Sequence, residues 1–308
     1  MAVNVAISGF GRIGRLVLRS IIESKRKDIN VVAINDLAPV DTNAFLLAND
    51  TVHGPLNEKI SVKKNKMTIG RKTISVLNER DPQKLPWKKM KIDVALECTG
   101  LFTSKEKASM HIKAGAKKVL VSAPCSEADK TIVYGVNEQE ITRNDLVVSN
   151  ASCTTNCLAP VVKVLHEKFG IVHGYMTTIH AFTGDQSVLD TFHPDLRRAR
   201  AASMSMIPTS TGAAKAVGLV MPELSGKLDG TAIRVPTPNV SLIDFKFVSK
   251  KTMIKKDTYV WEFKISLYPD TYTFNGDQTA LKLKSKKMVR HFGYLMPGFH
   301  FFGVCQRP

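Results

Sequence analysis

Two residues near the middle of the chain have the types needed for nucleophilic catalysis, Cys153 and His180. Cys153 lies in the run Ser149–Cys157, where a buried strand is predicted to give way to a helix. A helix N-terminus stabilises a thiolate, so we expect the thiol pKa of Cys153 to be lowered there. His180 ends a predicted strand, and a base at that point would take a hydroxyl proton as a hemithioacetal collapses by hydride loss. We therefore predict a cysteine nucleophile with a histidine partner.

Two other interpretations of the cysteines compete with this one. Cys157 follows Cys153 by one helical turn, and two cysteines at this spacing could provide half of the ligands of a metal site. No second pair of Cys or His with ligand spacing occurs in the sequence, so we predict no metal. A role in the core suits Cys157, Cys98 and Cys125, whereas the Ser and Thr around Cys153 argue against a purely apolar environment.

The hydride acceptor is indicated near the N-terminus by Gly9, Gly11 and Gly14, spaced as G-x-G-x-x-G. The motif follows a predicted strand and precedes a predicted helix, which is the context of a dinucleotide site. The helix N-terminus would bind the pyrophosphate through free N–H groups. Asp36 follows the second predicted strand. A carboxylate at this position would accept hydrogen bonds from the ribose hydroxyls of the cofactor and would repel a 2′-phosphate. The sequence therefore favours NAD over NADP.

The elements that position these residues alternate between strand and helix in the first half of the chain. Near-continuous apolar runs are typical of a parallel sheet covered on both faces. The predicted strands are residues 3–8, 31–35, 94–98, 119–122 and 146–150, with a helix over 15–22. After residue 150 we predict a helix from Ser152, strands over 174–180 and 231–235, and a long polar loop over 183–210.

Bulk composition narrows the class of protein. The 308 residues are enough for two domains, and we place a dinucleotide-binding domain at 1–151 and a second domain at 152–308. The sequence lacks a membrane-length apolar run and signal-peptide features, so we expect a cytoplasmic protein. Five cysteines indicate reduced thiols. The formal charge of +17 is high, but the lysines are scattered, some of them in short pairs, which favours a lysine-rich surface over specific nucleic-acid binding.

Several longer strings carry a family resemblance. They are Ile7–Arg15, Ala33–Leu37, Glu97–Gly100, Ser122–Pro124, Ser149–Cys157, Arg197–Ala202, Pro208–Lys215 and Arg234–Ser241. In content and order they resemble phosphorylating glyceraldehyde-3-phosphate dehydrogenase of the bacterial type, over residues 1 to about 247. The resemblance implies an α/β fold, with a Rossmann-type parallel-sheet NAD-binding domain and an α+β catalytic domain that contains a mixed or antiparallel sheet.

The resemblance also implies roles for individual residues. Cys153 is the nucleophile and His180 its base. The NAD pocket is lined by Gly9, Gly11, Arg12, Ile13, Gly14, Asp36, Arg80, Thr99 and Ser122. The attacking inorganic phosphate is bound by Ser152, Thr154, Thr211 and Gly212, and the phosphate of glyceraldehyde 3-phosphate by Thr183 and Arg234, with Arg198 in the same substrate-binding set. Hydroxyl and guanidinium donors suit phosphate oxygens. The family is typically tetrameric.

Beyond about residue 247 the sequence departs from the family pattern, and we interpret this part as aberrant or truncated. The asparagine that holds the nicotinamide carboxamide in the family is absent there, and glycine and proline near the end argue against a terminal helix. Two alternatives stay open. One is erythrose-4-phosphate dehydrogenase, which shares the Ser-Cys-Thr-Thr-Asn-Cys string. The other is a degenerate, non-catalytic paralogue that binds RNA through its basic surface.

Overall fold

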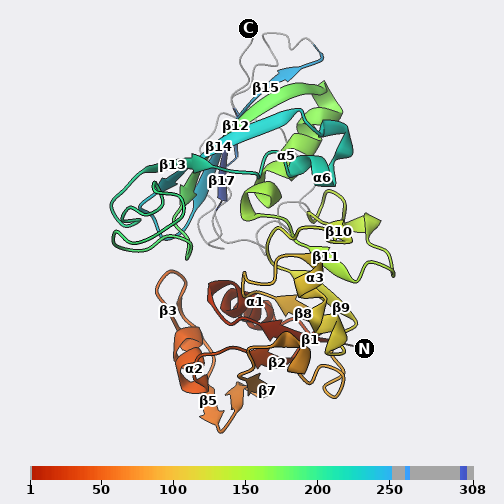
Figure 1. The fold of residues 1–308 in the computed structure, drawn as a ribbon, viewed down its shortest axis with the longest axis vertical. Coiled ribbons are helices and arrows are strands. Elements are labelled where there is room, and N and C mark those ends of the chain that lie inside the picture. Colours follow the sequence, from red (N-terminus) through yellow and green to blue (C-terminus); the bar gives the residue numbers. More distant parts are fainter. Residues whose placement is uncertain (1, 252–260, 264–298, 304–308) are drawn as a thin grey trace. The chain divides into compact units, whose positions relative to one another are not determined.

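The chain folds into two compact units in a computed structural model that describes residues 2–251, 261–263 and 299–303 (Figure 1). The first unit comprises Met1–Ile132 and Gln139–Ser152, and the second comprises Val133–Glu138 and Cys153–Pro308. The chain passes between the units three times: after Ile132, within the short 3-10 turn Glu138–Glu140, and just before Cys153.

A sheet of nine strands forms the first unit, in the order β10-β11-β9-β8-β1-β2-β7-β6-β5. Its strands are β1 (Val3–Ser8), β2 (Ile29–Asn35), β5 (Ile60–Lys63), β6 (Lys66–Ile69), β7 (Lys72–Leu77), β8 (Val94–Glu97), β9 (Lys118–Val121), β10 (Lys130–Thr131) and β11 (Val147–Ser149). The strands from β10 to β7 are parallel, whereas β6 and β5 add an antiparallel edge. The strand order reverses at β1, and sheets of this type bind ligands at the carboxyl ends of the strands beside such a reversal, here β1 and β8.

Both faces of this sheet are buried, because neighbouring residues of β1 belong to different core clusters. Ala6 packs with Trp87 on one face, and Ile7 packs with Leu18 on the other. The flanking elements are α1 (Arg12–Glu23), α2 (Val40–Ala48), α3 (Lys105–Ala108), α4 (Met110–Lys113), the 3-10 turn Pro82–Lys84 and the small pair β3 (Asn49–Asp50) and β4 (Gly54–Pro55). The expected parallel sheet covered on both faces is confirmed.

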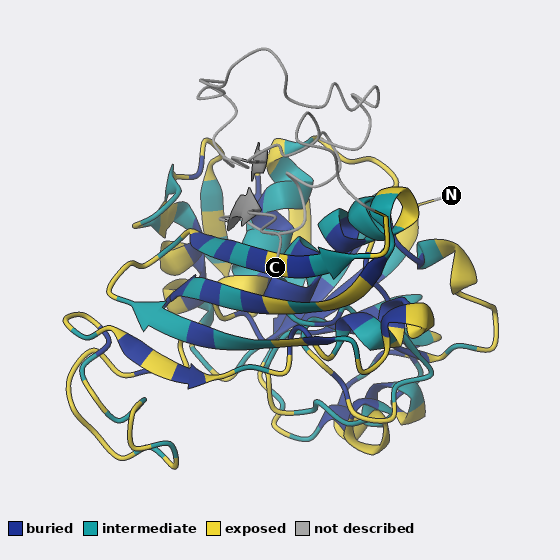
Figure 2. Ribbon diagram, turned by 90° about the horizontal axis from the view of Figure 1, so that it is seen from above, coloured by how far each residue is buried: buried dark blue, intermediate teal, exposed yellow. Residues whose placement is uncertain are grey.

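The second unit is built on a mixed sheet in the order β13-β14-β12-β15-β17-β16. Its strands are β12 (Ile171–Ala181), β13 (Ile207–Ser210), β14 (Leu228–Val235), β15 (Ser241–Ser249), β16 (Trp261–Phe263) and β17 (Phe299–Gly303). Strand β12 is parallel to β14 and antiparallel to β15. Helix α5 (Cys153–Phe169) packs on β12 and β15, and the short α6 (Val217–Val220) and the turn Pro222–Leu224 follow β13. Buried and more exposed residues alternate along the long strands, as Figure 2 shows.

The predicted fold class is confirmed, with differences in detail. The loop expected over 183–210 is wrong in its last four residues, which form β13 at the edge of the sheet. Pro208 concealed that strand, because a proline within an apolar run argues against a strand unless it lies at an edge. The expected lack of a terminal helix concerns residues outside the described ranges. Within the described part of the chain, no helix has the length and apolar character needed to cross a membrane.

Candidate active site

Cys153 is the first residue of α5, and a strained turn leads into it. Ala151 is buried and has φ 55, a left-handed conformation that costs about 1 kcal/mol for a residue with a side chain. The Ser149 hydroxyl accepts a hydrogen bond from Ala151 N at 3.1 Å and donates one to the carbonyl of Ala123 at 2.9 Å. These two bonds hold the turn that brings the thiol to the start of a helix. Sequence reasoning did not assign this role to Ser149.

His180 lies near the end of β12 and contacts the thiol directly. Its Nε2 atom is 3.3 Å from Cys153 Sγ, and its Nδ1 atom is 2.6 Å from the carbonyl oxygen of Ala181. A carbonyl oxygen only accepts, so Nδ1 carries the proton and donates to it. Nε2 of the neutral ring is therefore left to accept the thiol proton of Cys153, which is the arrangement that a base for this cysteine requires.

Both partners of this pair are neutral near pH 7. Burial lowers the pKa of His180 from its usual 6.5 to about 4, and the positive charges of Arg234 and Arg198 act in the same direction. Burial also raises the pKa of the Cys153 thiol, although hydrogen bonds with Thr154 and the charge of Arg234 favour the thiolate. The expectation of a lowered thiol pKa is thus wrong for this structure, because desolvation of the charged form outweighs the helix N-terminus.

Arg234 is placed beside His180 by strand register, since the two residues are paired across β12 and β14. The Arg234 guanidinium donates to the carbonyl of Ala181 at 3.3 Å and to the hydroxyl of Thr183 at 3.1 Å. Its Nε is buried and has no hydrogen-bond partner among the described residues. The pKa of Arg234 is lowered by burial, but the group stays charged at any ordinary pH. A cationic donor with spare N–H groups therefore lies next to the base.

A second arginine is held by residues that the sequence analysis overlooked. Arg198 forms an ion pair with Asp185 at 2.8 Å and donates to the Thr209 hydroxyl at 3.0 Å. Asp195 accepts from the same hydroxyl at 3.0 Å. In the sequence, the only sign of Asp185 is an acidic residue two positions after Thr183. The only sign of Thr209 is that it occupies a buried position of β13. Together they fix the direction of the Arg198 guanidinium.

The remaining residues predicted to bind phosphate surround the start of α5. Thr154 is buried and hydrogen-bonded to Cys153. The Thr211 hydroxyl accepts a hydrogen bond from Ala213 N at 3.2 Å. The carbonyl of Ala213 accepts a hydrogen bond from the Thr155 hydroxyl at 3.1 Å, and this bond connects the 211–213 turn to α5. Gly212 is exposed, and Ser152 is half-buried immediately before the helix.

The glycine turn after β1 has the geometry of a dinucleotide cradle. Gly9 has φ 87, and a Cβ on it would lie 2.6 Å from Thr99 N, so only glycine fits. A Cβ on Gly14 would lie 2.1 Å from the carbonyl oxygen of Gly9, whereas one on Gly11 would meet no atom of the described residues within 4 Å. Helix α1 begins at Arg12 without a side-chain cap from the described part of the chain, so its first N–H groups are available to a phosphate. These features fit the pyrophosphate of NAD.

The other predicted cofactor residues lie on the same unit. Asp36 accepts from Phe10 N at 2.7 Å and from Ala38 N at 2.9 Å, and its carboxylate keeps lone pairs for ribose hydroxyls. Arg12 is held by Asp50 at 2.8 Å, a partner that the sequence analysis missed. Ile13 and Arg80 are exposed, and Thr99 and Ser122 are half-buried at the ends of β8 and β9.

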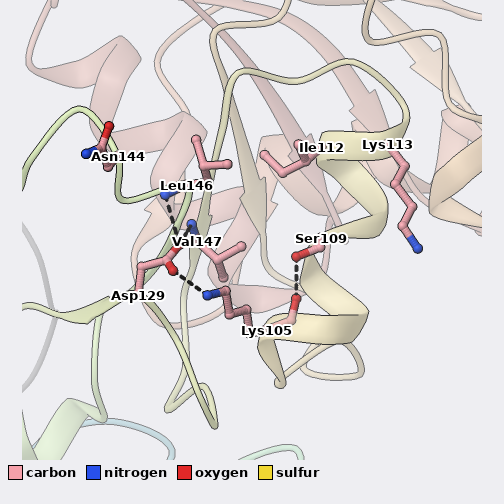
Figure 3. Close-up of a pocket in the computed structure, with 8 residues that line it drawn as sticks. All are labelled: Lys105, Ser109, Ile112, Lys113, Asp129, Asn144, Leu146 and Val147. Carbon is pink, nitrogen blue, oxygen red and sulfur yellow. Dashed lines mark hydrogen bonds and ion pairs between the residues drawn. The ribbon is translucent and has the colours of Figure 1, made fainter.

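A cavity of about 470 Å³ lies elsewhere in the first unit, and none of the predicted site residues lines it (Figure 3). Lys105 and Asp129 form an ion pair of 2.5 Å across it, and the Ser109 hydroxyl donates to the Lys105 carbonyl at 2.6 Å. Its polar groups thus largely satisfy one another. Within the described residues, no cluster of three or more His, Cys, Asp and Glu side chains is suited to a metal ion.

Two family models match the chain, one in each half. The family model described as the NAD-binding domain of glyceraldehyde 3-phosphate dehydrogenase matches residues 3–105, and that described as the C-terminal domain matches residues 152–261. The chain is 65% identical over 257 residues to glyceraldehyde-3-phosphate dehydrogenase of Xanthobacter flavus, covering 83% of this chain and 77% of that protein. It is 64% identical to that of Cereibacter sphaeroides (80% and 74% covered) and 57% identical to that of Geobacillus stearothermophilus (79% and 72%).

Proposed function

Because the chain belongs to the glyceraldehyde-3-phosphate dehydrogenase family, we propose that it oxidises glyceraldehyde 3-phosphate with NAD and inorganic phosphate, giving 1,3-bisphosphoglycerate, a reaction of glycolysis. The observation that carries this proposal is the 3.3 Å contact between Cys153 Sγ and His180 Nε2. The donors of Arg234 and Thr183, which contact each other beside that pair, suit a phosphorylated aldehyde.

The first step joins the substrate to the protein. Cys153 Sγ attacks the aldehyde carbon, and the C=O π electrons move onto oxygen. His180 Nε2 takes the thiol proton and returns it to that oxygen, which gives a neutral hemithioacetal and restores the neutral ring. The low pKa of His180, about 4, keeps the ring able to accept a proton at neutral pH.

The second step oxidises the hemithioacetal to a thioester. When bound, NAD supplies the acceptor for the hydride that leaves the former aldehyde carbon. His180 Nε2 takes the hydroxyl proton as the C–H bond breaks, so that the C=O bond forms again. Gly9, Gly11 and Gly14, with Asp36, would hold the cofactor at the start of α1.

Phosphate then completes the reaction. An oxygen of inorganic phosphate attacks the thioester carbon, the C–S bond breaks, and the leaving thiolate takes the proton from His180. Ser152, Thr154, Thr211 and Gly212 would bind this phosphate, while Thr183 and Arg234 bind the phosphate of the substrate. Arg198 would add positive charge to the same substrate-binding set. Two separate anion sites favour phosphate over water as the acyl acceptor.

We expect a cytoplasmic homotetramer. The loop between β12 and β13 supports an interface, because its large apolar side chains are exposed. These residues are Val188, Leu189, Phe192, Leu196, Met204 and Met206. Analytical ultracentrifugation of the purified chain measures its mass directly, and a monomer at micromolar concentration would contradict this expectation.

The decisive assay is NADH formation from glyceraldehyde 3-phosphate and NAD, with and without phosphate or arsenate, beside a Cys153→Ser control. Turnover that needs the anion and disappears in the control supports the proposal. Higher kcat/KM on erythrose 4-phosphate would instead assign the chain to that substrate. A folded protein without turnover, which retains RNA in a salt-sensitive manner, would favour the non-catalytic paralogue.

A further inference from the structure

A chain of three buried side chains lies beneath Thr99 in the first unit. Glu97, the last residue of β8, is 1% exposed, and His111 of α4 and Trp87 are both 0% exposed. His111 Nε2 is 2.9 Å from Glu97 Oε2, and Trp87 Nε1 is 3.0 Å from His111 Nδ1. The catalytic steps above use none of the three. Burying a carboxylate costs free energy unless the group is paired and hydrogen-bonded.

The direction of every hydrogen bond in this chain is determined by Trp87. An indole nitrogen only donates, so His111 Nδ1 must accept and carries no proton. Nε2 of the neutral ring then carries the proton and donates to Glu97. Glu97 Oε1 accepts from Thr99 N at 2.7 Å and from the Thr99 hydroxyl. An acceptor-only carboxylate thus satisfies donors on both sides.

Thr99 lies against the glycine turn that cradles the dinucleotide. The Cβ position of Gly9 is 2.6 Å from Thr99 N and 2.8 Å from Thr99 Cα. The Thr99 hydroxyl donates to Glu97 and accepts from Leu101 N at 3.0 Å. Since its proton is committed to Glu97, this hydroxyl has only a lone pair to offer a ligand. It is therefore set to accept from a hydroxyl or amino group of the cofactor.

We propose that Glu97, His111 and Trp87 form a positioning relay that fixes the Thr99 backbone and the polarity of the Thr99 hydroxyl for NAD binding. The relay rests on the proposed role of Thr99 in the cofactor site. Its three members act through Thr99 and do not themselves contact the reacting atoms.

The relay is specifically sensitive to the substitution Glu97→Gln. If the oxygen of the new amide faces Thr99, the NH₂ group of that amide meets the proton on His111 Nε2. His111 cannot turn to the other tautomer, because Nδ1–H would then meet the Trp87 N–H. If the amide is flipped, its NH₂ group faces Thr99 N–H instead. One donor–donor conflict remains in either orientation, and removing the Trp87 donor relieves it.

The experiment compares Glu97→Gln, Trp87→Phe and the double variant by NAD titration calorimetry and by thermal unfolding without NAD. We expect E97Q to raise the Kd for NAD about tenfold, the size of one buried unsatisfied donor, with kcat at saturating NAD nearly retained. W87F is expected to raise the Kd about two- to threefold, roughly the loss of one net hydrogen bond. In the W87F background the further effect of E97Q should shrink to about threefold or less, since the conflict is gone.

Met67→Ala is the matched control for lost stability, because Met67 is fully buried in β6, within the other core cluster. It should lower the Tm while the Kd for NAD stays within about twofold of wild type, because Met67 belongs to a different core cluster from Trp87. An E97Q protein that binds NAD like wild type, or equal effects of E97Q in both backgrounds, overturns the relay. A wild-type chain that does not bind NAD would instead overturn the proposed function.

A second pair of variants keeps the test open if E97Q does not fold. Thr99→Val removes the hydroxyl and keeps the shape of the side chain, whereas Thr99→Ser keeps the hydroxyl. We expect the valine variant to bind NAD about tenfold more weakly and the serine variant to stay within about threefold of wild type. Equal NAD affinity in the valine variant and the wild type would overturn the proposal, because Glu97 would then hold a hydroxyl that the cofactor does not use.

Discussion

Two alanine substitutions in the glycine turn should fail in different ways. In Gly14→Ala the new Cβ would lie 2.1 Å from the carbonyl oxygen of Gly9 and 3.0 Å from Ile7 Cγ2, where ordinary contact begins at 3.4 Å. Ile7 lies within β1, and Gly9 N donates to the carbonyl of Asn35 at 2.8 Å, so α1, which carries Gly14, must move. Overpacking of this kind costs about 3 kcal/mol, and a loss of about 3 kcal/mol lowers Tm by roughly 6–12 °C in a chain of this size.

Gly11→Ala has room for its methyl group and an allowed backbone. Apart from its two chain neighbours, no heavy atom of the described chain lies within 4 Å of the Cβ position, and φ −67 is outside the left-handed region that favours glycine. Tm without NAD should therefore change by less than about 2 °C, since no contact is strained. The methyl would, however, occupy the space through which a pyrophosphate approaches the backbone. We expect the Kd for NAD to rise at least about tenfold, a loss of about 1.4 kcal/mol.

Differential scanning calorimetry without NAD and titration calorimetry with NAD separate the two outcomes. The reasoning fails if G14A unfolds at the wild-type temperature, because the close approach of Gly9 and α1 would then be absent. It fails equally if G11A binds NAD like wild type, because the pyrophosphate would then lie elsewhere.

Three further predictions concern the charges of the site. Arg234→Lys keeps the positive charge but loses the planar set of guanidinium N–H donors, including the Nε–H that has no partner among the described residues. We expect kcat/KM to fall about a hundredfold for glyceraldehyde 3-phosphate and about tenfold or less for unphosphorylated glyceraldehyde; equal losses on the two aldehydes would refute a phosphate role. Asp36→Ala removes the carboxylate that disfavours a 2′-phosphate. The kcat/KM for NADP, divided by the kcat/KM for NAD, should therefore rise at least about tenfold. An unchanged ratio would contradict this prediction. The pKa of His180 is lowered to about 4 in the folded protein, so the free energy of unfolding should fall by up to roughly 3 kcal/mol between pH 6.5 and pH 4. Urea unfolding across that range should show a weaker pH dependence for His180→Asn than for wild type. Equal dependence of the unfolding free energy on pH in the two proteins would count against the shift.

Much of the site was predictable because its chemistry is local in the sequence. The glycine turn, Asp36 and Cys153 each lie within a few residues of a strand end, so a strand–turn–helix pattern locates them. The contact of His180 with Cys153 spans 27 residues and was anticipated from residue type and strand position. The lowered pKa of His180 could not be predicted, because its causes, burial and the charge of Arg234, depend on the pairing of β12 with β14.

The residues that the sequence did not reveal are those whose role is to hold another residue in place. Glu97 looks like the polar end of an apolar strand, and its partner His111 is 14 residues distant in the chain. Asp185 and Thr209 become meaningful only when β13 returns beside β14 and brings Arg198 to them. Such residues carry no motif, because their function lies in holding another residue.

His180 and His111 show how one neighbour determines what a histidine does. His180 Nδ1 faces a carbonyl oxygen, an acceptor, so its Nε2 is left as the base for Cys153. His111 Nδ1 faces an indole N–H, a donor, so its Nε2 is left as the donor for Glu97. Both rings are buried, and exchanging the two neighbours would exchange the two roles. The chemistry of each ring therefore follows from the polarity of the atom behind it, and this is why replacing Trp87, which takes no part in the reaction, should alter cofactor binding.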